Sequence, residues 1–242
     1  YRNFLLKNVK DDRIMPTFEG LRLKILKYPR TGKLFTKRRR KQLIDTDFTI
    51  ISNNCWGGMI YESYNLPKES PTVGLFFMAD DYIKFLTHLK EYFAAPLYFI
   101  RPEYSRWKNE YAVKGDKRFG SYPVGKLDIS IGGGEKESIE IFFLHYHSDK
   151  EAKEKWERRI RRINWNKLLI KFNDQNGCIE EHIRAFDELP YKNKVCFTVK
   201  EYSQYKSVVW IKAPKSHEFI RASYEPFGKT RYIDMAELLN SL

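Results

Sequence analysis

The chain has 242 residues and a formal net charge of +13 at pH 7, and 16% of its residues are aromatic. This length and composition suit one large domain or two small ones with a substantial core, and only three cysteines argue against a disulfide scaffold. The low, odd number of cysteines favours a reducing, cytoplasmic setting. Because no apolar run is long enough to span a bilayer and no signal peptide is visible, we expect a soluble protein, and its charge favours anionic partners.

The first part of the chain is basic and has no clear period. Residues 1–33 are compatible with a short strand or a short helix, and residues 1–45 could form a small N-terminal extension. Five consecutive basic residues at 37–41 follow Thr36, a candidate helix N-cap. A basic run alone is a weak signal, so we favour a solvated helix face over a nucleic-acid or head-group patch.

The segment 48–58 predicts a strand that ends at a functional site. A β-branched run over residues 48–51 is followed by a polar turn, by Cys55 and by the glycine pair Gly57 and Gly58, after which a helix is predicted. A thiol at a helix N-terminus can be activated by backbone dipoles, and the glycine amides are candidate oxyanion donors. The alternative is that Cys55 is a small buried hydrophobic residue.

Residues 72–78 predict a second strand, and Asp80 and Asp81 open a helix with an apolar face that continues to residue 93. An acidic pair suits the positive end of the helix dipole. We favour this explanation over a metal-binding pair of the kind found in sugar-nucleotide transferases, because that motif has a residue between its aspartates.

The middle of the chain predicts an antiparallel insertion near residues 101–137. A strand at 97–100 is followed by a polar, aromatic loop or lid over 101–119, a strand at 122–131 and a hairpin turn at the glycines 132–134. A mostly apolar strand over 139–146 then brings His145 to its C-terminal end.

The second half alternates helices and strands. Ser148 or Asp149 caps a basic helix, in which Arg158 and Arg159 could grip an anion or pair with glutamates of the same helix. A strand at 168–172, a helix at 179–189, strands at 194–199 and 207–211 and a helix at 233–242 follow. We therefore predict a single α/β domain with a largely parallel or mixed sheet flanked by helices.

Polar residues follow three of the predicted strands, and open α/β sheets bind ligands at the carboxyl ends of their strands. Cys55, His145 and either Asn173 or Asp174 could therefore meet as nucleophile, base and orienting group, in the chain order of papain-like enzymes. His147 could replace His145. The remaining cysteines, Cys178 and Cys196, are expected to be structural, and because no zinc-site spacing or nucleotide loop is present, we predict no metal and no cofactor.

Short motifs in the chain resemble a known family. They are Ser52-Asn-Asn-Cys-Trp-Gly-Gly58, Ser70-Pro-Thr-Val-Gly-Leu-Phe-Phe77, Phe143-Leu-His-Tyr146, Lys155-Trp-Glu-Arg-Arg159 and Arg162-Ile-Asn164. Together they resemble domain-of-unknown-function family 1919, whose bacterial members are often labelled exopolysaccharide biosynthesis proteins. The order of cysteine, histidine and Arg-Arg helix is also similar to a family described as papain-like cysteine peptidases. The first resemblance implies a cytoplasmic role connected with surface polysaccharide.

The leading hypothesis is an enzyme of surface-polysaccharide assembly that uses Cys55 for acyl transfer or hydrolysis. The residues assigned to substrate binding are Asn54, Trp56, Gly57, Gly58, Arg158 and Arg159. Two alternatives remain open: a sugar-nucleotide-dependent transferase that uses Asp80 and Asp81, and a non-enzymatic binding protein for an anionic polymer. The expected partner is an anionic small molecule or polysaccharide precursor rather than nucleic acid, and peripheral membrane contact stays open.

Overall fold

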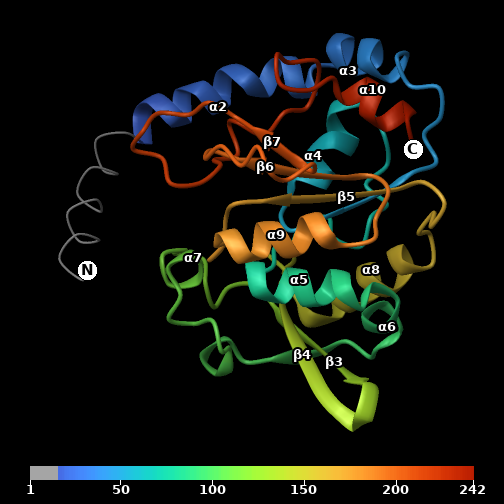
Figure 1. Cartoon of the computed structure of the whole chain (residues 1–242), viewed down its shortest axis with the longest axis vertical. Helices are drawn as coiled ribbons and strands as arrows, with labels where there is room; N and C mark the ends of the chain where they lie inside the picture. The colour runs from blue at the N-terminus through green and yellow to red at the C-terminus, as the bar shows by residue number, and fades with distance from the viewer. Residues whose placement is uncertain (1–15) are drawn as a thin grey trace.

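The computed structural model describes residues 16–242, which form two separate sheets (Figure 1). The larger sheet is parallel, with the strand order β1-β5-β6-β7. Its strands are β1 (Thr49–Ser52), β5 (Leu168–Asn173), β6 (Lys194–Thr198) and β7 (Val208–Trp210). The α/β class with a parallel sheet flanked by helices is confirmed.

Apolar side chains fill both faces of the parallel sheet, as expected for strands that helices cover on each side. Alternate residues point to opposite faces, so Ile50 packs toward α4 (Trp56–Ser63) and α10 (Met235–Asn240), while Ile51 packs toward the opposite layer. That layer contains α5 (Ala79–Thr87), α8 (Asp149–Ile160) and α9 (Glu180–Glu188) (Figure 1).

The smaller sheet is antiparallel, as the sequence predicts for this region. It contains β2 (Tyr98–Ile100), β3 (Val124–Ile131) and β4 (Glu135–Phe142) in the order β2-β3-β4. The predicted hairpin turn joins β3 to β4, and Gly133 and Gly134 take φ values of 84° and 83° there, which glycine adopts without strain. Between β2 and β3 the chain forms a 3-10 turn (Pro102–Tyr104) and the short helix α7 (Tyr111–Lys114).

Two of the expected elements differ from the structure. The strand predicted over 139–146 is β4, which ends at Phe142, so His145 follows a strand of the antiparallel sheet and not of the parallel one. The predicted helix over 80–93 is divided into α5 and α6 (Leu89–Ala94), because His88 takes a non-helical conformation between them.

The expectation of a strand over residues 72–78 is also wrong. This segment is a buried turn with one bridge between Phe76 and Phe142, although it runs beside the edge strand β1. Side-chain hydroxyls of this segment replace the backbone hydrogen bonds that a neighbouring strand would make with β1. Thr72 accepts a hydrogen bond from the backbone amide of Ser52 at 3.1 Å, and Ser70 donates to the carbonyl of Ile50. The edge of β1 is thereby satisfied without a fifth strand.

The basic N-terminal segment forms α2 (Pro16–Thr31) and α3 (Lys33–Arg40), which contact α4. Gly32 is the N-cap residue of α3, so Thr36 lies inside the helix and the predicted cap at Thr36 is wrong. Arg39 joins the two helices to α4 by donating to the carbonyls of Pro29, Arg30 and Ser63. Within residues 16–242, no helix is long and apolar enough to cross a membrane.

Asp80 and Asp81 lie in the first turn of α5, but their environments differ. Asp80 pairs with Lys84 one turn later at 2.7 Å, on the surface. Asp81 is fully buried and accepts hydrogen bonds from Arg106, from the indole of Trp107 and from the amide of Glu140 at 3.1 Å. Because protein donors surround Asp81, the pair is not available as a metal-binding site, and no metal-ligating cluster occurs among the described residues.

We expect Asp81→Ala to lower the free energy of unfolding by about 2–4 kcal/mol, because three donors lose a buried acceptor. The matched change Asp80→Ala should cost less than about 0.5 kcal/mol, as for an exposed pair one helical turn apart. Urea denaturation monitored by tryptophan fluorescence measures both. A manganese-dependent rise in melting temperature that requires both aspartates would contradict this assignment.

Candidate functional site

The carboxyl ends of β1 and β5 bring together polar side chains that are far apart in the sequence. Asn53 and Asn54 follow β1, while Lys171 and Asn173 belong to the end of β5. The parallel register places Ser52 beside Lys171, so the residues after each strand meet at one edge of the sheet.

A loop that follows β7 adds a carboxylate to this edge. Glu225 accepts hydrogen bonds from the ammonium of Lys171, from the side-chain amide of Asn54 at 2.9 Å and from the side-chain amide of Asn173 at 2.8 Å. Asn53 donates to Asn173 at 2.8 Å. We call these five residues, Asn53, Asn54, Lys171, Asn173 and Glu225, the polar centre.

The polar centre is almost entirely shielded from solvent. The side chains of Lys171 and Glu225 are 0% and 2% exposed, and the Lys171 ammonium lies 5.6 Å from the ring centre of Trp56. Burial lowers the pKa of Lys171, and the neighbouring Glu225 opposes that effect. A buried cation of this kind is tolerated because a carboxylate and amide oxygens replace its hydration shell.

Sequence reasoning missed both ends of this ion pair. Lys171 interrupts an otherwise apolar strand that is predicted to be buried, and a charge at such a position is a signal for a buried partner. Glu225 lies in a loop without a periodic pattern, so nothing local indicates it as that partner.

Cys55 lies at the N-terminus of α4, where the sequence places it. Its thiol is half-buried and contacts the carbonyl of Leu75 at 3.8 Å. Burial raises the pKa of Cys55 to about 11, and the nearby charge of Glu225 acts in the same direction. The thiol is therefore protonated near neutral pH, in contrast to the activated thiolate that a helix N-terminus can produce.

Two backbone amides at the start of α4, those of Trp56 and Gly57, already have side-chain acceptors. Asn54 accepts from the amide of Trp56 at 3.0 Å, and Ser52 accepts from the amide of Gly57 at 3.2 Å. The glycines allow close packing: a Cβ at Gly57 would lie 3.0 Å from the Ser52 hydroxyl, and one at Gly58 would lie 3.1 Å from Val73. In this structure Gly57 therefore serves packing and capping, not an open oxyanion site.

His145 lies in the same region as Cys55. Its amide donates to the carbonyl of Gly74, next to the Leu75 carbonyl that contacts the thiol. Burial, with the positive charges of Arg118 and Lys68, lowers the pKa of His145 and favours the neutral imidazole.

Asp174 has a different role. Its carboxylate accepts from the amides of Val199 at 2.7 Å and Ile220 at 2.6 Å, which joins β5 to β6 and to the loop after β7. Within residues 16–242, no hydrogen bond joins Asp174, His145 and Cys55. Asn173, the other predicted orienting residue, belongs to the polar centre. The structure brings Cys55 and His145 into one neighbourhood, and Asp174 is committed elsewhere.

The other residues assigned to substrate binding are dispersed. Trp56 is fully buried, and its indole donates to the carbonyl of Pro226 at 2.8 Å. Arg159 is buried and donates to the Tyr146 hydroxyl at 2.6 Å, whereas Arg158 is exposed on the same helix. The two arginines therefore do not form a single anion-binding fork.

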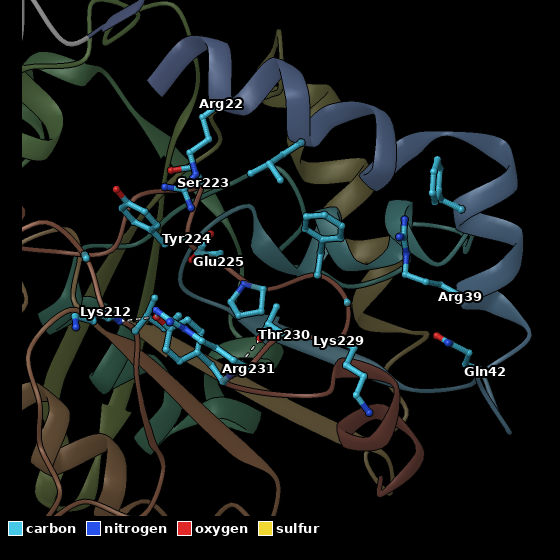
Figure 2. Close-up of a pocket in the computed structure, with 18 of the residues that line it drawn as sticks. Arg22, Arg39, Gln42, Lys212, Ser223, Tyr224, Glu225, Lys229, Thr230 and Arg231 are labelled. Atoms are coloured by element: carbon cyan, nitrogen blue, oxygen red, sulfur yellow. Dashed lines mark hydrogen bonds between the residues drawn. The ribbon is translucent and has the colours of Figure 1, made fainter. Parts of the chain in front are cut away.

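A pocket that shares Glu225 with the polar centre is lined by several cations (Figure 2). It has a volume of about 820 Å³ and lies between helices α2 and α3 and the segment 211–232. Its lining in the described chain includes one carboxylate, Glu225, and the cations Arg22, Arg38, Arg39, Lys212, Lys229 and Arg231. We call it the basic pocket.

A second pocket, of about 910 Å³, lies at the ends of β5, β6 and β7 and shares Lys212 with the basic pocket. Its charges are balanced in the described chain: the acids Glu110, Asp174 and Glu218 accompany the lysines Lys200, Lys212 and Lys215. Of the two pockets, the basic pocket is therefore the candidate site for an anion.

One family model and one other protein match this chain. The model of the family described as "Domain of unknown function (DUF1919)" matches residues 29–241. A protein of Haemophilus influenzae, described as an uncharacterized protein, is 36% identical over 173 residues, which is 72% of this chain and 72% of that protein. The family match spans the polar centre, and it begins at Pro29, near the C-terminal end of α2.

We expect Glu225→Ala to reduce the free energy of unfolding by about 3–5 kcal/mol, because it leaves the buried Lys171 ammonium without its carboxylate partner. Lys171→Met should also destabilise the protein, but the double variant Lys171→Met/Glu225→Leu should cost less than the sum of the single changes. Chemical denaturation measures the cycle, with the exposed Glu237→Ala as a control. Additive effects of the two changes would show that the ion pair is not the coupling element.

Alkylation of Cys55 by iodoacetamide should accelerate about tenfold per pH unit from neutral pH upward, because only the thiolate reacts and its pKa is near 11. Mass spectrometry of the modified peptide resolves Cys55 from Cys178 and Cys196, and Cys55→Ser provides the blank. If the rate rises with pH but already reaches a plateau before about pH 8, the thiol has a low pKa and Cys55 is an activated thiolate.

Proposed function

This chain belongs to the family described as domain of unknown function 1919, and we propose that its basic pocket binds a phosphate-bearing or carboxylate-bearing sugar precursor of bacterial surface polysaccharide. The observation that carries the proposal is the excess of cations around one pocket at the carboxyl edge of the parallel sheet. A pocket of this size is in the range of small-molecule sites.

The cations approach the pocket from two directions. Arg38 belongs to α3 and lines the pocket. Arg22 comes from α2, whereas Lys212 and Arg231 come from the segment after β7, so a bound anion would contact both sides (Figure 2). Arginine suits this task because its planar fork matches the oxygens of phosphate and carboxylate. The lining carboxylate, Glu225, pairs with Lys171 and therefore opposes the field of the pocket only in part.

Aromatic side chains supply the apolar part of the pocket. The guanidinium of Arg22 lies 4.5 Å from the ring centre of Tyr224, and that of Arg39 lies 5.3 Å from the ring centre of Phe227. Rings with an apolar face and nearby donors suit a ligand that combines a sugar or base with a charged group. The polysaccharide context of the proposal comes from the labels of the family's bacterial members.

A nucleotide sugar is one ligand of this chemistry, because its diphosphate is an anion that arginines recognise. In that case the pocket cations would hold the diphosphate directly. The route through a metal ion at Asp80 and Asp81 is not proposed, since Asp81 is saturated by protein donors.

The second candidate function is acyl transfer or hydrolysis by Cys55 with His145 as base. It is favoured by the common neighbourhood of the two residues and by the lowered pKa of His145, which keeps the imidazole available as a base. The raised pKa of Cys55 weighs against it. The lining of the basic pocket in residues 16–242 does not include Cys55, so the binding proposal is independent of thiol chemistry.

The binding proposal predicts that inorganic pyrophosphate and nucleoside diphosphate sugars bind the wild-type protein in calorimetry. Arg38→Ala/Arg231→Ala should weaken binding at least about tenfold, because two charge-assisted contacts are lost. Both residues are exposed, so the folded state should be retained, as circular dichroism can verify.

The matched control is Lys200→Ala/Lys215→Ala, which removes two positive charges from the second pocket. Equal weakening by both double variants would show that only net charge matters. No binding of any of these anions by the wild-type protein would overturn the proposal.

A further inference from the structure

Helix α2 exposes an apolar stripe on its outer side. Leu21, Ile25 and Tyr28 are 55%, 63% and 68% exposed, and their spacing of four and three residues places them on one face of the helix. The ring of Tyr28 contacts Phe35 of α3, with 5.5 Å between the ring centres, and Leu34 is 79% exposed. We call these five residues, Leu21, Ile25, Tyr28, Leu34 and Phe35, the apolar stripe.

The opposite face of α2 is turned toward the protein. Leu26 lines the basic pocket, and Arg30 pairs with Glu62 of α4 at 3.8 Å. Figure 1 shows α2 and α3 along the outer margin of the molecule, on the side of the sheet that α4 covers. The α2 residues of the apolar stripe, Leu21, Ile25 and Tyr28, are therefore on the face of α2 directed away from the parallel sheet. Phe35 of α3 is partly exposed and also lines the basic pocket.

The same segment concentrates the charge of the whole chain. Residues 20–44 contain ten lysines and arginines and no acidic residue, which accounts for +10 of the net +13. Six of these cations are exposed: Lys24, Lys27, Lys33, Lys37, Arg38 and Lys41. A basic surface that also exposes large apolar side chains differs from an ordinary solvated helix face, which is polar throughout.

We propose that α2 and α3 dock on an anionic lipid surface, with the apolar stripe inserted at the head-group boundary and the surrounding cations in contact with lipid phosphates. Apolar burial and electrostatic attraction are the two contributions that bind interfacial helices. Charge complementarity selects this occupant: an acidic protein would satisfy the cations, but a fluid apolar layer below a layer of phosphates satisfies cations and stripe together.

This docking has a consequence for the basic pocket. Arg22, Phe35 and Arg38 line that pocket and belong to the docking helices. Membrane contact would hold the pocket close to the head groups, where an anionic precursor attached to a lipid would be presented. The docking itself does not depend on the function proposed for the pocket.

The test is co-sedimentation of the full chain with vesicles of phosphatidylcholine, alone or mixed with phosphatidylglycerol. We expect binding only to the mixed vesicles, and weaker binding at high salt. Leu21→Ser/Ile25→Ser should reduce the partition coefficient at least about tenfold, and Lys24→Glu/Lys27→Glu should do the same through charge.

Two matched controls separate the docking face from general properties. Tyr104→Ser/Ile179→Ser removes comparably exposed apolar side chains elsewhere, 65% and 56% exposed, and Lys150→Glu/Lys153→Glu makes the same charge change on α8. Both controls should bind like the wild type. The proposal would be overturned if the controls lost as much vesicle binding as the test variants, or if the wild type did not sediment with the mixed vesicles. It would also be overturned by a dimer in light scattering that Leu21→Ser/Ile25→Ser abolishes, because a second copy would then cover the stripe.

Discussion

The buried ion pair between Lys171 and Glu225 is the constraint on which the candidate site depends. Lys171 is the third residue from the end of the central strand β5. Its ammonium has no access to water, so a neighbouring negative charge must neutralise it. The neutralising carboxylate comes from a loop 54 residues further along the chain. This requirement fixes the path of the segment after β7 across the carboxyl edge of the sheet, and the same segment forms one wall of the basic pocket.

The asparagines complete this arrangement by satisfying both charges. Asn54 donates to Glu225 and accepts from Lys171 at 3.0 Å, so a single amide bridges the ion pair. The same residue accepts from the amide of Trp56 and thereby begins α4. Strand end, helix start and loop are consequently coupled, because a change in any one of them leaves a buried polar group without its partner. This accounts for the polar residues of the Ser52–Gly58 motif without assigning them to catalysis.

The candidate site was predictable only in its general position. Strand-ending polar residues correctly indicate the carboxyl edge of the parallel sheet, since Asn54 and Asn173 are both in the polar centre. Their roles were not predictable, because Asn173 and Asp174 are adjacent in sequence yet serve different contacts. His145 illustrates the same limit: an apolar strand precedes it as expected, but that strand belongs to the antiparallel sheet, and periodicity does not specify which sheet a strand joins.

The sequence by itself determined the elements that depend on neighbouring residues. The helix α8 with its Ser148 cap, the glycine hairpin between β3 and β4, and the alternation that produces a parallel sheet all follow from patterns within a few residues. The sequence also determined the concentration of charge in residues 20–44. Tertiary structure alone decided that Lys171 meets Glu225, that Asp81 is buried beside Arg106, and that the stripe on α2 faces outward. The physical reason is the sequence distance over which each interaction acts. Capping and periodicity act within one or two turns of chain, whereas the partner of a buried charge depends on the strand register and on the path of a distant loop.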